Sequence, residues 1–189
     1  MFRRIGATAT IVLLLGACSE ERVPTEPLEA TDISLVELRA LVSDRGLLVP
    51  GRYRVSAQIE SVVIPSRNDD DFQAQAIGQM MRDKTKDVPG VTSEYCLGPD
   101  AAFDPRGEEV VECRVPSFRM VGSDVVFTMT CPTPSGDEIS SAEFTGTIAE
   151  GGYALSSVTK VPVTPGPTAE TRDATVHAKV TGERLGECG

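Results

Sequence analysis

The chain has 189 residues, of which 40% are hydrophobic, 24% charged and 5% aromatic, a composition typical of a soluble globular protein of one domain. Lysine and arginine total 18 and aspartate and glutamate 28, so the formal charge is -10 and we expect no nucleic-acid partner, because a phosphate backbone needs a basic face. One histidine and no tryptophan exclude His-rich metal sites, Ser-His-Asp triads and tryptophan sugar platforms in their usual forms.

Residues 1–17 have the pattern of a signal peptide. Two arginines near the start precede 13 apolar or small residues, fewer than the roughly 20 that a membrane-spanning helix needs. Leu15-Gly16-Ala17-Cys18 resembles the lipobox of bacterial lipoproteins, in which lipid is attached to the cysteine and the chain is cut before it. The sequence therefore predicts a lipid anchor at Cys18 as the contact with the membrane.

The anchor predicts a protein of the cell envelope. Several acyl chains on one residue hold a protein stably on a membrane. Cleavage would leave 16 basic and 28 acidic residues, a side-chain charge of -12 that disfavours lying flat on anionic lipid. Ser19 follows Cys18, and the sorting rule of enteric lipoproteins then places the protein on the periplasmic side of the outer membrane rather than on the inner membrane. Residues 18–30, acidic and with two prolines, are expected to form a flexible tether before one domain over residues 31–189.

Four cysteines remain beyond the predicted anchor, an even number in an exported chain, which favours two disulfides. A thiolate metal site or a redox pair is the alternative. It is disfavoured because there is no C-x-x-C and the gaps of 17, 18 and 57 residues do not resemble paired zinc ligands. We expect no metal and no cofactor. The four are Cys96, Cys113, Cys131 and Cys188.

A short helix is predicted over residues 35–43. Ser34 and Glu37 fit a capping box, Ile33 and Leu38 fit the hydrophobic staple around it, and Gly46 is a plausible stop. The expected buried face is Leu35, Leu38, Leu41 and Val42. A half-buried strand follows over residues 49–60, where Tyr53, Val55, Ala57 and Ile59 alternate with polar residues.

A second helix is predicted over residues 70–83, where apolar side chains recur at helical spacing. They are Phe72, Ala76, Ile77, Met80 and Met81. The acidic run Asn68-Asp69-Asp70-Asp71 before it could bind calcium, but acids are also favoured at a helix N-terminus, and neither a glycine nor a distal glutamate completes a calcium loop.

A hairpin is predicted within residues 108–131, with Gly122-Ser123 as its turn. This register sets Met120 opposite Val125, Phe118 opposite Phe127 and Pro116 opposite Met129. It also sets Cys131 opposite Arg114 and turns Cys113 to the other face. A direct Cys113–Cys131 bond is then disfavoured, because the two Cβ atoms must face each other. We expect Cys96 to pair with Cys113 and Cys131 with Cys188.

Two further segments alternate with a period of two. Residues 142–155 predict a hairpin with Gly151-Gly152 as its turn and Ile148 opposite Leu155. After a proline-rich break, a last strand over residues 174–181 places His177 on its polar face, where no neighbouring nucleophile supports catalysis. The fold class is therefore mainly β: an antiparallel meander or half-barrel with one or two short helices packed on it, stapled by disulfides.

Several landmarks occur together in this chain: Pro50-Gly51-Arg52-Tyr53, Tyr95-Cys96-Leu97 followed by Pro99-Asp100, two cysteines around a hairpin, and the ending Gly182-Glu183-Arg184-Leu185-Gly186-Glu187-Cys188. The set resembles the small envelope proteins of the domain of unknown function 3617, over about residues 49–189. Gly98 replaces the threonine usual in that family's Cys-Leu-Thr-Pro motif. The resemblance implies a secreted or lipid-anchored envelope protein with structural cysteines, and no reaction.

The residue supply disfavours an enzyme, since Glu108 and Glu109 would point to opposite faces of a strand and no phosphate loop occurs. Two other classes remain open. One is a binding module whose curled sheet holds a lipid or another apolar molecule, and the other is a structural or interaction protein that offers its surface or sheet edge to an envelope partner. Candidate lining residues for an apolar ligand are Met80, Met81, Phe118, Phe127, Met129 and Phe144.

Overall fold

The computed structural model describes residues 26–65, 72, 74–76, 78–79, 83, 90–99, 101–106, 112–132, 139–163 and 172–189. The predicted signal peptide, the lipidation site Cys18 and most of the tether lie outside these residues, as do the acidic residues 69–71 and 108–109. Within the described part, no helix has both the length and the apolar character needed to cross a membrane.

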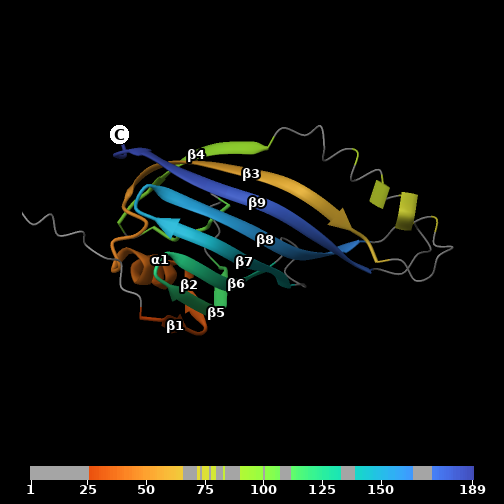
Figure 1. Cartoon of the computed structure of the whole chain (residues 1–189), viewed down its shortest axis with the longest axis horizontal. Helices are drawn as coiled ribbons and strands as arrows, with labels where there is room; N and C mark the ends of the chain where they lie inside the picture. Colours follow the sequence, from red (N-terminus) through yellow and green to blue (C-terminus); the bar gives the residue numbers. More distant parts are fainter. Residues whose placement is uncertain are drawn as a thin grey trace, which may run out of the picture.

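The fold is one antiparallel sheet, as predicted. Its spatial order is β1-β5-β6-β7-β8-β9-β3-β4, and β2 also pairs with β5, so that β5 to β9 form a meander (Figure 1). The strands are β1 (Leu28–Ala30), β2 (Ile33–Ser34), β3 (Gly51–Val63), β4 (Val91–Leu97), β5 (Arg114–Val121), β6 (Asp124–Pro132), β7 (Ile139–Ala149), β8 (Gly152–Val163) and β9 (Arg172–Gly186).

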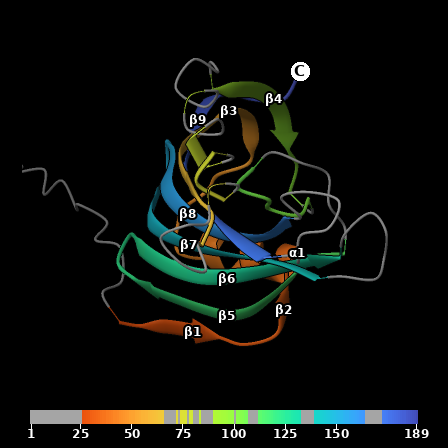
Figure 2. The same ribbon diagram turned by 90° about the vertical axis from the view of Figure 1, so that its right-hand side faces the viewer.

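The sheet is strongly curved, and helix α1 (Leu35–Ser43) lies on its concave side (Figure 2). Side chains from α1, the concave face of the strands and the segment after β4 form one buried cluster. The half-barrel expectation is therefore confirmed, with the core between the sheet and its helical cover.

The predicted tether is too long at its C-terminal end. Leu28 and Ala30 pair with Met120 and Phe118 of β5, so the last three residues assigned to the tether form a strand at one edge of the sheet. Both side chains pack against the core. The folded domain therefore begins at or before Leu28 instead of Thr31, because pairing with β5 outweighs the proline-rich, acidic character of the preceding residues.

Helix α1 begins with the predicted capping box. The Glu37 amide donates to the Ser34 hydroxyl at 3.2 Å, and the Ser34 amide donates to the Glu37 carboxylate at 2.7 Å. Gly46 has the left-handed φ of +74° expected of the stop. One predicted core position differs, because Leu41 is only half-buried while Arg39 is buried and donates to the carbonyl of Pro99.

Strand β3 follows the predicted alternation as far as Ala57, and then a bulge interrupts it. The register with β9 shifts between Ile59 and Ser61, so that Val62 becomes the next buried residue. Ile59 keeps the predicted face but is 45% exposed. The bulge leaves Glu60 without a partner in the ladder.

The second predicted helix differs from the expectation at two of its five expected buried positions. Residues 72, 74–76, 78–79 and 83 are helical, as predicted. Phe72, placed on the buried face by its spacing, is 73% exposed, and Ala76 is exposed as well, whereas Ala74 is buried. The other three expected positions, Ile77, Met80 and Met81, lie outside the described residues.

The β5–β6 hairpin has the predicted turn and partly the predicted register. Met120 faces Val125 and Phe118 faces Phe127. The register then shifts by one between Ser117 and Arg114, and Pro116, expected opposite Met129, is exposed. Proline has no N–H to donate to the ladder, which favours a bulge at this position.

The β7–β8 turn lies one residue earlier than predicted. Ala149 pairs with Gly152, so the turn is Glu150-Gly151 and Ile148 faces Tyr153 instead of Leu155. Gly152 instead belongs to β8, where an added Cβ would clash with the Gly182 carbonyl oxygen. Because the register slips by two, every side chain keeps its predicted face.

Candidate functional site

The cysteines form two disulfides, as expected, but with a different pairing. Cys96 is joined to Cys188 and Cys113 to Cys131. The bulge after Arg114 is the reason: it sets Arg114 opposite Thr130, so that Cys113 turns to the concave face and meets Cys131. The predicted pairs Cys96–Cys113 and Cys131–Cys188 are wrong because they assumed an unbroken register along β5.

The two disulfides have different surroundings. Both Cys96 and Cys188 are exposed, and their bond ties edge strand β4 to the end of β9. Cys113 and Cys131 are buried, with exposed fractions of 2% and 6%, and belong to the core. The first disulfide therefore lies on the surface of the domain, and the second lies in its core.

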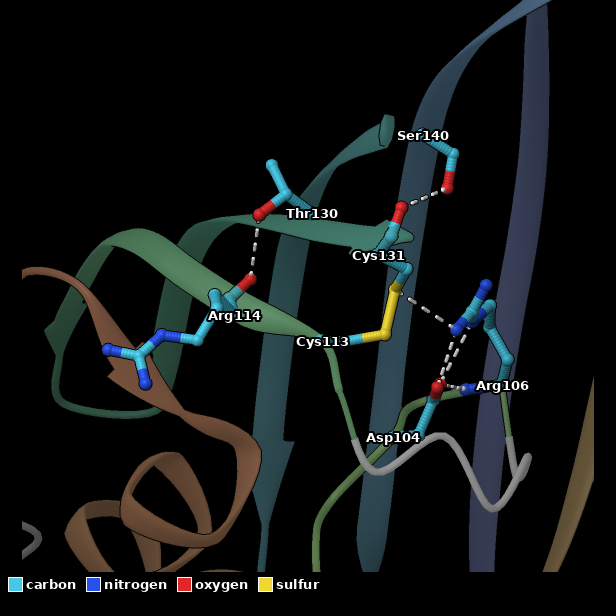
Figure 3. Close-up of a disulfide and its surroundings, with 7 residues drawn as sticks. All are labelled: Asp104, Arg106, Cys113, Arg114, Thr130, Cys131 and Ser140. Carbon is cyan, nitrogen blue, oxygen red and sulfur yellow. Dashed lines mark hydrogen bonds and ion pairs between the residues drawn. A yellow bond between two sulfur atoms is a disulfide. The ribbon is translucent and has the colours of Figure 1, made fainter. Parts of the chain in front are cut away.

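An ion pair lies beside the buried disulfide (Figure 3). Nη2 of Arg106 is 2.6 Å from the buried carboxylate of Asp104 and 3.6 Å from Sγ of Cys131. Nε and the backbone amide of Arg106 also donate to Asp104 Oδ1. Sequence reasoning missed both residues, because an aspartate two positions before an arginine is too common a pattern to indicate a site.

The candidate lining residues that the structure describes lie in the filled core. Phe118, Phe127, Met129 and Phe144 are each at most 3% exposed. Phe127 and Phe144 stack with ring centroids 4.8 Å apart, in the same cluster as α1. The other two candidates, Met80 and Met81, lie outside the described residues. This placement favours core packing for the four described residues.

A different part of the concave face leaves apolar side chains uncovered. Val91 is 70% exposed, Ile59 45% and Val161 39%. The register places them beside the half-buried Ala57 and Ala178. We call this region the open patch. Its paired positions carry only aliphatic or hydroxyl side chains. Glu60 lies in the neighbouring bulge. Half-buried Ser93, Thr159 and Val176 complete it, whereas Val62, Ser157 and Ala174 on the same face are buried.

Three tyrosines stack in the covered part of the core. The ring of Tyr53 lies 6.1 Å from that of Tyr95 and 6.5 Å from that of Tyr153. The Tyr153 hydroxyl donates to the carbonyl of Pro105 at 2.8 Å. Burial raises the pKa of Tyr95 to about 12 and raises the pKa values of Tyr53 and Tyr153 as well. These phenols stay protonated at neutral pH and do not act as bases, and the hydroxyl of Tyr53 donates to the carbonyl of Val49.

The polar candidates do not assemble into a site. His177 is half-buried on the convex face, between Ser61 of β3 and Val158 of β8. Among the residues that the structure describes, no three histidine, cysteine, aspartate or glutamate side chains gather in a way that could hold a metal ion. The acidic runs at residues 69–71 and 108–109 are outside the described part.

Comparison with protein-family models matches residues 48–188 to the family described as a protein of unknown function, DUF3617. No curated protein and no solved structure shows significant similarity to the chain. The match spans nearly the whole sheet, from the residues before β3 to the cysteine after β9. The chain therefore belongs to the DUF3617 family.

Proposed function

We propose that this chain is a lipid-anchored protein of the cell envelope, on the periplasmic side of the outer membrane, whose domain binds the acyl chain of a lipid on the open patch. Residues 15–18 and Ser19 support the anchor and its location. Two disulfides support an oxidising compartment. The proposal assigns no reaction, no metal and no cofactor to the chain.

The open patch carries the binding part of the proposal. It continues the apolar concave face along β3, β4 and β8, where Ile59, Val91 and Val161 meet solvent. Contiguous exposed apolar surface in a soluble domain indicates a binding site. Its paired positions offer no charge to recognise a polar ligand, whereas the convex face carries exposed ion pairs such as Arg54 with Glu94. An uncharged, flexible hydrocarbon chain is the ligand that such a surface complements.

The anchor is tested by fractionation. Wild-type protein is expected in the membrane fraction and Cys18→Ser in the soluble fraction, because the cysteine sulfur is the proposed attachment point. Incorporation of labelled palmitate should be lost in the same variant. Unchanged membrane retention of Cys18→Ser would refute the anchor, and the open patch has a separate test.

Acyl-chain binding is tested with the mature chain carrying Cys18→Ser and a fluorescent sixteen-carbon fatty acid. Saturable binding is expected, with at least tenfold weaker affinity for Ile59→Asp, since a charge would be buried under the ligand. Val126→Asp is the matched control: Val126 is 47% exposed, close to Ile59, but lies on the convex face. Absence of saturable binding, or equal loss in both variants, would exclude the open patch as a lipid site.

A second candidate function is protein binding through the sheet edge. β4 ends the strand order of the described residues, and its pairing with β3 stops at Ala57 although β3 continues to Val63. An exposed strand edge is a template for another chain. A photo-crosslinker at Thr92 on this edge should then capture an envelope protein in intact cells, while one at Ser156, in the middle of the convex face, should not.

A further inference from the structure

The positively charged guanidinium of Arg106 contacts one of the two sulfurs of the buried disulfide. Nη2 of Arg106 approaches Sγ of Cys131 at 3.6 Å, and no hydrogen bond to Cys113 Sγ is recorded among the described residues (Figure 3). A guanidinium beside a sulfur favours the thiolate over the thiol, because the charge is stabilised by a nearby positive donor. The two cysteines are therefore unequal once their bond opens, and Cys131 holds the negative charge better.

Among the residues that the structure describes, the charged groups next to this disulfide keep Arg106 in place or lie on the exposed side. Asp104, 2% exposed, binds the guanidinium through both carboxylate oxygens and so fixes it beside Cys131. Its own negative charge opposes a thiolate, but the group that contacts Cys131 Sγ is the guanidinium. Arg114, the neighbour of Cys113, pairs with Asp32 on the exposed side of the sheet. From β7, Ser140 contributes an uncharged hydrogen bond to the carbonyl of Cys131.

Access to this disulfide depends on local opening, and the ladder between β5 and β6 is interrupted close to Cys113. The bulge between Arg114 and Ser117 interrupts the ladder to β6 directly after Cys113. Glu112 and Arg114, on either side of Cys113, are exposed. Short stretches with an interrupted ladder open at lower free energy than the rest of a sheet. Opening at this point exposes Cys113.

We propose that Cys113–Cys131 is a reducible disulfide, with Cys113 as the sulfur that a dithiol reductant of the envelope attacks and Cys131 as the leaving thiolate held by Arg106. The reductant's thiolate forms a bond to Cys113 Sγ while the Cys113–Cys131 bond breaks and its electron pair goes to Cys131. The second thiol of the reductant gives up its proton and attacks the mixed disulfide. Cys113 leaves and takes up a proton, and the reductant ends as a disulfide, having supplied two electrons.

The second disulfide provides an internal comparison. Cys96 and Cys188 are exposed, and no hydrogen bond from a cation to either sulfur is recorded in the described part of the chain. At equilibrium we expect Cys113–Cys131 to be reduced at a lower ratio of dithiothreitol to its disulfide than Cys96–Cys188. Differential alkylation and peptide mass analysis of the mature Cys18→Ser chain measure both midpoints in one sample. Coincident midpoints, or the reverse order, would overturn the proposal.

Substitution of Arg106 separates an electrostatic role from a structural one. If Arg106 favours the Cys131 thiolate by about tenfold, Arg106→Gln shifts the Cys113–Cys131 midpoint towards stronger reductant by about fivefold at pH 8.5 and not measurably at pH 6, where the thiol is protonated. Arg106→Lys should restore most of the shift. Arg114→Gln, which removes an arginine next to Cys113 that contacts neither sulfur, should change neither midpoint.

A purely structural role for Arg106 would shift the midpoint equally at both pH values, and that result contradicts the proposal. Should Arg106→Gln fail to fold, the Cys113→Ser variant leaves Cys131 as a single free thiol next to an intact Arg106. Its thiolate absorbance at 240 nm is then expected at lower pH than that of the corresponding free Cys96 in Cys188→Ser. If both thiols form thiolates at the same pH, the proposed role of Cys131 as the leaving thiolate is excluded.

Discussion

The concave face of this sheet has two parts that share one residue pattern and differ in what covers them. In the covered part, Phe127 and Tyr53 lie against α1 or the segment after β4 and are almost fully buried. In the open patch, Ile59 and Val91 occupy equivalent alternating positions but meet solvent. Alternation therefore specifies which face a residue takes, whereas burial depends on what packs on that face.

The largest loss of stability is expected on removal of a disulfide, and the loss should differ between the two because they close loops of different length. Replacing Cys96 and Cys188 with alanine frees a loop of 92 residues and is expected to lower the free energy of unfolding by about 4–5 kcal/mol. Replacing Cys113 and Cys131, 18 residues apart in the covered part, should cost about 3 kcal/mol. Urea denaturation of both variants measures the difference, and a larger loss for the second pair would contradict the loop argument.

Truncation in the covered part should be far more damaging than in the open patch. Phe127→Ala removes a stacked, buried ring and is expected to lower the free energy of unfolding by about 3–5 kcal/mol. Ile59→Thr, which keeps the β-branch in the open patch, should cost less than about 1 kcal/mol. Similar losses in the two variants would show that the open patch is covered in solution.

Alkaline pH should unfold the covered part through its tyrosines. Burial raises the pKa of Tyr95 from 10.0 to about 12 in the folded state, so the folded chain holds the phenolic proton more tightly than the unfolded chain does. This contribution to stability is complete below pH 10 and is lost as the pH rises towards 12. Since the chain has three tyrosines, all in this cluster, absorbance at 295 nm reports on it alone. Ionisation of all three near pH 10 with an intact fold would contradict the burial.

Of these four predictions, removal of the N-terminal cap of α1 should have the smallest effect on stability. Ser34→Ala removes the hydroxyl that accepts from the Glu37 amide and is expected to lower the free energy of unfolding by about 1 kcal/mol. Hydrogen bonds from Ser34 lower the pKa of Glu37 from 4.5, so the cap stabilises the fold above that pH and is lost as the pH falls below it. Thermal unfolding at pH 7 and pH 3 checks both statements. As a control, Ser156→Ala at an exposed position of the convex face should change neither the stability at pH 7 nor its loss at pH 3.

Local features of the chain could be predicted because their causes lie within a few residues. The capping box of α1, the alternation in β3 and β9, and the Gly122-Ser123 turn all follow from short-range spacing, and the structure has them. The mainly β meander follows as well, since strands joined by short turns pair in sequence order. Four cysteines in a chain with a predicted export signal were enough to predict two disulfides, but not their pairing.

Long-range features required the tertiary structure. The bulge next to Pro116 reverses Cys113 and so decides both disulfides, and it depends on how β5 meets β2 and β6. The close approach of Gly152 to Gly182 moves a turn by one residue. The sequence by itself determined β3, β9, the two hairpins and the capped helix, and the faces of their side chains outside the bulges, because these depend on neighbours in the chain. It did not show β1, β2 or β4. The tertiary structure decided the pairing of the cysteines, the ion pair beside Cys131 and the uncovered part of the concave face, because these depend on which distant segments meet.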